Sequence, residues 1–284
     1  MNWLTEPFAL GFMQRSLIAS VIVGVVCSLI GCYVVLRSMA FLGDALAHAI
    51  LPGVAVAYLA GVNLLAGALV AGLLVAVGIS FVSRSGTIRE DTAIGVFFAA
   101  ALALGVVLIS TMDTYAVDLT HVLFGNVLGV SKLDLWISGG LAGVVVACVA
   151  LLYKRLLVVS FDPILGQTLG LRTHLLRTGL FLMLAATIVV SLRTVGVALV
   201  AAMLVTPPAA AYLLTRRLPA MMAVSVAIGI VSAIGGLYAS YYLNVASGGA
   251  MVLVATAFFL LAFVFAPHKG VLARLRRPRR STAS

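Results

Sequence analysis

Long apolar stretches, separated by short polar ones, run through almost the whole chain. A hydrocarbon core about 30 Å thick is crossed by about 20 apolar residues in helical form. Stretches of about that length lie at roughly 16–36, 63–82, 92–111, 134–153, 175–192, 194–214, 220–243 and 250–266. A shorter apolar run, about 45–60, follows a polar break from Arg37 to Asp44. Because barrel strands would alternate polar with apolar residues, the pattern predicts an all-α, polytopic membrane protein with eight to nine transmembrane helices.

The composition agrees with a membrane protein. Of the 284 residues, 63% are hydrophobic and 9% are charged, whereas soluble domains have about 45–50% and about 25%. These fractions exclude a soluble globular protein, a disordered chain and a secreted disulfide scaffold. Cys27, Cys32 and Cys148 lie in apolar runs without a CxxC pair and are expected to be small buried residues. We expect a single transmembrane domain at 1–267, followed by a basic tail at 268–284.

Topology explains the formal net charge of +10, which comes from 18 Lys and Arg against 8 Asp and Glu. The loops at 83–91 and 154–177, the turn at 216–217, Arg37 and the tail together hold 15 of the 18 basic residues. Because Lys and Arg are concentrated in cytoplasmic loops, this side is predicted to be cytoplasmic, with the C-terminus there. The tail holds six basic residues and no acid, and it is expected to lie against anionic headgroups. Nucleic acid is not needed as a partner.

The chain contains no GxxxxGK[ST] phosphate loop, the element with which many ATPases hold nucleotide. If ATP drives this protein, a separate subunit must therefore hydrolyse it.

A single acidic residue falls outside the expected loops and span ends, and this residue is Asp44. His48 follows it by four residues, so both side chains share one face of a helix. A carboxylate oxygen and a neutral imidazole nitrogen are suitable ligands for Zn²⁺ or Mn²⁺. Pro52-Gly53 can break the helix nearby, as ion sites in transporters often require. Because two ligands are too few for tight binding, a two-fold dimer would have to bring two such pairs together.

Two other interpretations of this pair stay open. In the first, Asp44 caps the short helix and His48 hydrogen-bonds a neighbouring span. In the second, Asp44 and His48 form a proton relay. His121, which follows Asp118 by three residues in an expected outer loop, is interpreted as an interfacial residue.

A second feature is the predicted cytoplasmic segment 161–171. Asp162 suits an N-cap, Pro163 the first helical position and Gly170 the C-terminal cap, so a helix of about seven residues is predicted outside the membrane. Ile164, Leu165 and Leu169 would not favourably face water. This helix therefore lies on lipid headgroups or on its own bundle, or its apolar ridge docks into the groove of a partner.

The double proline Pro207-Pro208 lies inside an apolar run and is predicted to break the helix near Thr206. Such a break is either a structural kink or part of a cavity-lining pathway.

Several motifs together resemble those of a known family. The most specific is GDALAHAILPG from Gly43 to Gly53. The supporting motifs are LFGNVL at 123–128, Phe161-Asp162-Pro163, the segment from Gly196 to Pro207, and SYYLNVASG at 240–248. Over nearly its whole length the chain resembles the permease subunit of the zinc/manganese class of ATP-binding-cassette importers. It departs from that family at Asn244 and Ala246, where Asp and Pro are common, and in having two prolines where one is usual.

The resemblance implies an all-helical fold related to the vitamin B12 and siderophore importer permeases, in a homodimer or pseudo-dimer. It also implies two cytoplasmic ATPase subunits and an extracytoplasmic metal-binding protein as partners. Asp44 and His48 would contact the ion in the translocation path. The residues implied to contact the ATPase, in a coupling helix at about 162–170, are Asp162, Pro163, Ile164, Leu165, Gly166, Leu169 and Gly170.

The expected function is thus the permease of an ATP-driven importer of Mn²⁺ or Zn²⁺ in the cytoplasmic membrane, working by alternating access. The ion is cargo, no cofactor is expected to stay bound, and the subunit itself performs no covalent chemistry. A proton-coupled secondary cation transporter is the alternative. A membrane metalloprotease is disfavoured because HExxH and a general-base Glu within a span are both missing.

Overall fold

The computed structural model describes residues 11–85, 88–111, 129–192, 196–267 and 270. In these ranges the chain is helical and contains no strand, which confirms the all-α prediction. The elements are α1 (Gly11–Leu36), α2 (Ala40–Ala49), α3 (Leu51–Leu59), α4 (Leu64–Val82), η2 (Ser83–Ser85), α5 (Glu90–Ser110), α7 (Lys132–Phe161), α8 (Pro163–Thr168), α9 (Thr173–Leu192), α10 (Val197–Leu214), α11 (Leu218–Leu243) and α12 (Ser247–Phe265).

Within the described ranges, eight helices are long and apolar enough to cross a membrane by length and composition. They are α1, α2 together with α3, α4, α5, α7, α9, α11 and α12. The apolar helix α10 adds a further element of similar length, so the prediction of eight to nine spans is confirmed. The outer surfaces of α5, α7 and α12 expose large apolar side chains such as Val96, Leu151 and Leu253, as helices facing lipid do.

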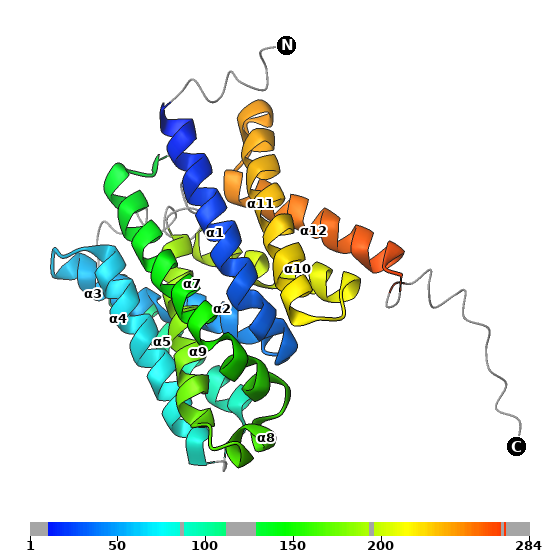
Figure 1. Cartoon of the computed structure of the whole chain (residues 1–284). Coiled ribbons are helices and arrows are strands. Elements are labelled where there is room, and N and C mark those ends of the chain that lie inside the picture. Colours follow the sequence, from blue (N-terminus) through cyan, green and yellow to red (C-terminus); the bar gives the residue numbers. More distant parts are fainter. Residues whose placement is uncertain (1–10, 86–87, 112–128, 193–195, 268–269, 271–284) are drawn as a thin grey trace, which may run out of the picture.

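Helix α1 is the centre of the bundle and packs against α11, α10, α7 and α9 (Figure 1). Small residues allow this packing: a β-carbon on Gly24 would lie 2.8 Å from the carbonyl oxygen of Gly229 in α11. Close approach of backbones through small residues is typical of helix pairs in membranes. The buried core around α1 includes Tyr33 of α1 and Phe181 of α9, both fully buried.

The short apolar run after Arg37 forms two helices, α2 and α3, which meet at Ile50. Pro52 cannot donate a hydrogen bond to the turn before it. The N–H of Ile50 bonds the carbonyl of His48, and the regular pattern resumes where the N–H of Val54 bonds the carbonyl of Ile50. The predicted break near Pro52-Gly53 is therefore confirmed, and α2 with α3 reaches the length of a span.

The break predicted near Thr206 is wrong, because α10 continues as one helix through Pro207 and Pro208. Pro208 has no N–H with which to bond the carbonyl of Leu204. That carbonyl is covered by α1 instead: a β-carbon on Gly31 would overlap the Leu204 oxygen and lie 2.7 Å from Cγ of Pro208. Proline is tolerated in membrane helices where a neighbouring helix accommodates the freed backbone group. Pro207 and Pro208 are buried within the bundle and do not line a break.

Basic residues of separate segments lie close enough to interact: Arg37 of the α1–α2 connection, Arg84 of η2, and His174 and Arg177 in the first turns of α9, the helix that follows α8. Their positive charges repel one another: Arg177 acts on Arg37, and both Arg177 and Arg84 act on His174. Burial lowers the pKa of Arg37, the nearby carboxylate of Glu90 opposes that shift, and Arg177 adds to it. Of the predicted tail at 268–284 only Gly270 is described, and the motif at 123–128 and His121 lie outside the described residues.

Candidate functional site

Asp44 and His48 lie one turn apart on the same face of α2. His48 Nε2 is 3.7 Å from Asp44 Oδ1, and the side chains are 27% and 42% exposed, respectively. The remaining positions of α2 that hold the helix in the bundle are buried: Leu42, Gly43, Ala45, Leu46, Ala47 and Ala49. Burial of those positions directs the polar pair toward the surface of the protomer and not into its core. The predicted helical spacing is confirmed, and the side chains are accessible to a ligand.

Two aromatic rings border the pair. The ring of Phe98, on α5, lies edge-on to the His48 imidazole with 6.0 Å between ring centroids. Phe98 also contacts Phe41 of α2 in an edge arrangement at 5.7 Å. Helix α10 supports the other side, since a β-carbon on Gly43 would lie 3.3 Å from Cδ2 of Leu204. The position of the imidazole is therefore set by α5 as well as by its own helix.

One protomer supplies an incomplete ligand set. Among the described residues, no cluster of three or more His, Cys, Asp or Glu could hold a metal ion. A carboxylate and an imidazole suit a divalent first-row ion, but structural zinc sites use four protein ligands and catalytic zinc sites three. The arrangement can therefore contact a divalent cation and release it, and tight binding would need ligands from elsewhere.

The predicted helix after Asp162 is present as α8 (Pro163–Thr168). The Asp162 carboxylate accepts hydrogen bonds from the backbone N–H groups of Ile164, at 2.9 Å, and Leu165, at 3.0 Å. The chain leaves the helix through Gly170, whose φ of +72° lies in the left-handed region that favours glycine. The predicted cap residues at both ends are confirmed, and α8 itself ends two residues before Gly170.

Helix α8 exposes an apolar ridge while it stays fixed to the bundle. Ile164 and Leu165 of α8 and Leu169, the residue that caps its C-terminal end, are 74%, 49% and 61% exposed, and the three together are called the ridge of α8. On the opposite side Gly166 is buried, and a β-carbon there would lie 3.0 Å from Cγ2 of Thr173 at the start of α9. The ridge is thus not used for packing within the described part of this protomer, and Gly166 fixes α8 against α9.

The segment 240–248 forms the turn between α11 and α12. Asn244 adopts a left-handed conformation with φ of 51°, which Asn tolerates better than most residues. The hydroxyl of Ser240 donates to the carbonyl of Val245 at 2.6 Å. The departure from the family at Asn244 therefore fits the local backbone, because the position ends α11.

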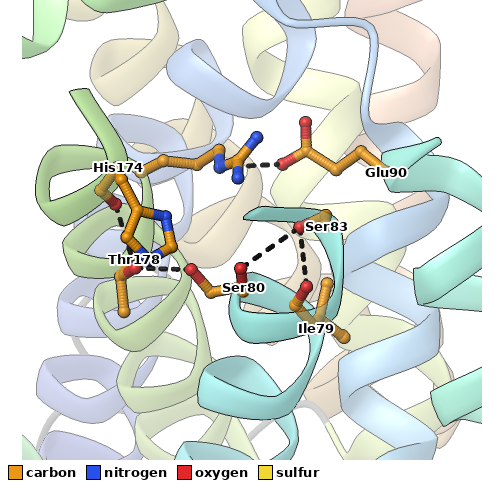
Figure 2. Close-up of polar contacts among 7 residues, drawn as sticks. Ile79, Ser80, Ser83, Glu90, His174 and Thr178 are labelled. Carbon is orange, nitrogen blue, oxygen red and sulfur yellow. Dashed lines mark hydrogen bonds and ion pairs between the residues drawn. The ribbon is translucent and has the colours of Figure 1, made fainter. Parts of the chain in front are cut away.

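Sequence reasoning missed one ion pair, between Glu90 of α5 and Arg177 of α9. Oε1 of Glu90 and Nε of Arg177 are 3.8 Å apart, and both side chains are largely buried, at 19% and 21% exposed. Figure 2 shows Glu90 reaching toward the first turns of α9, where His174 and Thr178 lie. The available signal was the position of Glu90, an acidic residue at the start of a span. That signal did not identify its partner, because Arg177 is 87 positions away in the sequence.

Comparisons with known proteins agree over nearly the whole chain. The model of the ABC 3 transport family matches residues 9–266. The chain is 49% identical, over 98% of its length and 99% of the relative, to the manganese transport system membrane protein MntC of Listeria monocytogenes.

Two solved structures match the fold. The structure of PsaBC from Streptococcus pneumoniae in complex with Fab has a TM-score of 0.86 and 36% identity, and covers 97% of this chain and 99% of that one. An inward-facing conformation of a putative metal-chelate type ABC transporter has a TM-score of 0.72 over 88% of this chain and 85% of that one. Its identity of 14% makes it a likeness of fold alone.

Proposed function

This chain belongs to the ABC 3 transport family, and on that premise we propose that it is the membrane permease of an ATP-driven importer of divalent transition metal ions, with Mn²⁺ as its principal cargo and Zn²⁺ as the competing candidate. The observation that carries the proposal is the Asp44–His48 pair, which lies accessible on α2 within a bundle of membrane-spanning helices. The Listeria relative is a manganese transport system membrane protein, which supports Mn²⁺. The ligand types suit Mn²⁺ and Zn²⁺ alike.

The transport site forms between two copies of the chain. One copy offers one carboxylate and one imidazole, and a two-fold axis beside α2 would bring together two oxygen and two nitrogen ligands. Closed two-fold symmetry is the commonest form of soluble homo-oligomers. The exposure of the pair at the protomer surface supports this arrangement, because a site completed within one chain would be enclosed by it.

Transport proceeds by alternating access. An extracytoplasmic metal-binding protein delivers the ion to the outer mouth, and the ion contacts Asp44 and His48 as it crosses. Closure of two cytoplasmic ATPase subunits then exposes the ion to the cytoplasm. A small number of ligands favours this function, because the ion must bind well enough to enter and weakly enough to leave.

Helix α8 is the contact with the ATPase. Its ridge of Ile164, Leu165 and Leu169 is apolar and exposed, and an apolar helical ridge commonly docks into a groove of a partner. Asp162, Pro163 and Gly170 set the ends of α8, and Gly166 fixes it to α9. Residues 1–267 form one permease domain, and the basic tail at 268–284 lies on the cytoplasmic face of the cell membrane.

Uptake by the reconstituted complex tests this function. The chain, purified together with its ATPase, is placed in vesicles, and ATP-dependent entry of radiolabelled Mn²⁺ and Zn²⁺ is measured in the presence of the binding protein. Asp44→Ala and His48→Ala are each expected to lower uptake at least about tenfold, which corresponds to a loss of about 1.4 kcal/mol. Asp91→Ala, which removes an exposed carboxylate from α5, is the matched control and should transport normally.

Undiminished ATP-dependent uptake by both variants would refute the role of Asp44 and His48. Uptake by the chain alone under a proton gradient, with no ATP, would instead support a secondary transporter. Competition between the two ions at equal concentration identifies the preferred cargo.

A further inference from the structure

A continuous series of contacts connects α8 with His48. It begins where Gly166 of α8 packs on Thr173, the first residue of α9. One turn further along α9, Arg177 pairs with Glu90 at the start of α5. Two turns along α5, Phe98 contacts the His48 imidazole. Eight residues of helix span about 12 Å, so the rigid segment from Glu90 to Phe98 joins the two ends of the series.

Glu90 also interacts with the segment that begins α2. Arg37 lies between α1 and α2, and its guanidinium and that of Arg177 both attract the Glu90 carboxylate. The connection from Arg37 to α2 is short and tightly bonded. Ser38 is left-handed with φ of 56°, and the N–H of Met39 bonds the carbonyl of Val34 at 3.0 Å. The position of Arg37 is therefore closely tied to the start of the helix that carries Asp44.

Three structural elements thus meet at one carboxylate: the α1–α2 connection through Arg37, α5 through its own backbone, and α9 through Arg177. Arg177 is paired with this largely buried carboxylate, and Arg37 on a separate element attracts it; attraction between charges is stronger in a partly buried site than in water. Beside this cluster, the hydroxyls of Ser80 on α4 and Thr178 on α9 are hydrogen-bonded to each other. That bond holds the first turns of α9 to α4, while Glu90 holds them to α5 (Figure 2).

We propose that Glu90 is a positioning residue that couples α8 to the metal site, because it joins Arg177 of α9 both to α5, which contacts His48 through Phe98, and to the connection that leads into α2, the helix that carries Asp44 and His48. This inference rests on the proposed function. Movement of α8 with the ATPase shifts the first turns of α9, and Glu90 transfers that shift to α5 and to the α1–α2 connection. Phe98 and Arg37 then move His48 and Asp44 together, which changes the geometry offered to the ion.

The test measures ATP hydrolysis and Mn²⁺ uptake on the same vesicles containing the complete complex. Glu90→Gln keeps the size and removes the charge. It is expected to lower the number of ions imported per ATP about tenfold, a typical size for coupling between two sites, while assembly with the ATPase and ATP hydrolysis continue. Glu90→Asp should recover part of the ratio. Asp91→Asn removes the same charge from the next, exposed position and should leave the ratio unchanged.

A double-mutant cycle distinguishes coupling from general damage. If Glu90 acts through Arg177, Glu90→Gln combined with Arg177→Gln lowers the ratio no further than Glu90→Gln alone. Additive losses, or an unchanged ratio in Glu90→Gln, would overturn the inference. If Glu90→Gln fails to assemble, Phe98→Leu applies the same test with the ion pair intact, and a normal ratio there overturns it equally. Absence of uptake by the wild-type complex would contradict the proposed function instead, so the two failures are separate.

Discussion

The carbonyl oxygen of Leu204 lies so close to Gly31 that no β-carbon fits between α10 and α1. The same contact includes the ring of Pro208, whose Cγ would be 2.7 Å from that β-carbon. The glycine on one helix and the proline on the other are therefore complementary. Pro208 leaves a backbone carbonyl without its helical donor, and Gly31 allows α1 to cover that carbonyl.

Gly31→Ala is expected to destabilise the protein. The added methyl group would force α1 and α10 apart, and overpacking of this kind costs about 1–3 kcal/mol. Thermal unfolding of the protein in detergent should show a lower Tm. Gly140→Ala on α7 is the control, because a β-carbon there meets nothing within 4 Å, and its Tm should stay equal or rise slightly. Equal Tm values for both variants would contradict the close contact.

Pro208→Ala is expected to leave transport largely intact. Alanine supplies the N–H that the carbonyl of Leu204 lacks, which stabilises α10. It also removes the contact of the proline ring with α1, which weakens the packing, so the two effects on stability oppose each other. The net change in free energy should therefore be below about 0.4 kcal/mol, which corresponds to less than a twofold change. Uptake of Mn²⁺ should accordingly stay within about twofold of wild type. A large loss of uptake with an unchanged Tm would show that the proline has a role in the pathway after all.

Leu165→Glu is expected to abolish co-purification with the ATPase. It places a charge on the exposed ridge of α8 without disturbing the Asp162 cap or the buried Gly166. Burying an unpaired charge in an interface costs several kcal/mol. Gln167→Glu introduces the same charge at another exposed position of α8 and serves as the control. If both variants bind the ATPase as wild type does, α8 is not the docking surface.

The three cysteines are expected to differ in their reaction with a thiol reagent. Cys27 and Cys32 are fully buried in the core around α1, whereas Cys148 of α7 is only half-buried against that core. A thiol must be accessible and ionised to react. A membrane-permeant maleimide, followed by mass spectrometry, should therefore label Cys148 before the other two. Equal labelling of all three in the folded protein would contradict the central position of α1.

The spans and caps were predictable because they depend on local chemistry. Apolar length determines a membrane helix, and Asp162 with Gly170 determines where α8 can begin and where the chain can turn. The break between α2 and α3 also follows locally, from Pro52. Helix α8 and the spacing of Asp44 and His48 were therefore predicted correctly from short segments of sequence.

The failures came from tertiary contacts. Pro207 and Pro208 carry the same local signal as Pro52, yet α10 stays continuous because Gly31 of α1 accommodates the freed carbonyl. The ion pair of Glu90 with Arg177 joins residues far apart in the sequence. No local pattern specifies such pairs, since they depend on which helices become neighbours after packing.

The proposed sharing of the metal ligands between two copies of the chain would have a genetic consequence. In a cell that makes both wild-type chains and Asp44→Ala chains, the two kinds of chain are expected to form mixed dimers, because the substitution removes one side chain from the shared surface and leaves the rest of α2 in place. Each mixed dimer would lack one carboxylate at the shared site, because neither chain holds a complete ligand set by itself. The altered allele would therefore behave as dominant negative for metal uptake, whereas an allele that prevents folding, such as a severe change at Gly31, would be recessive.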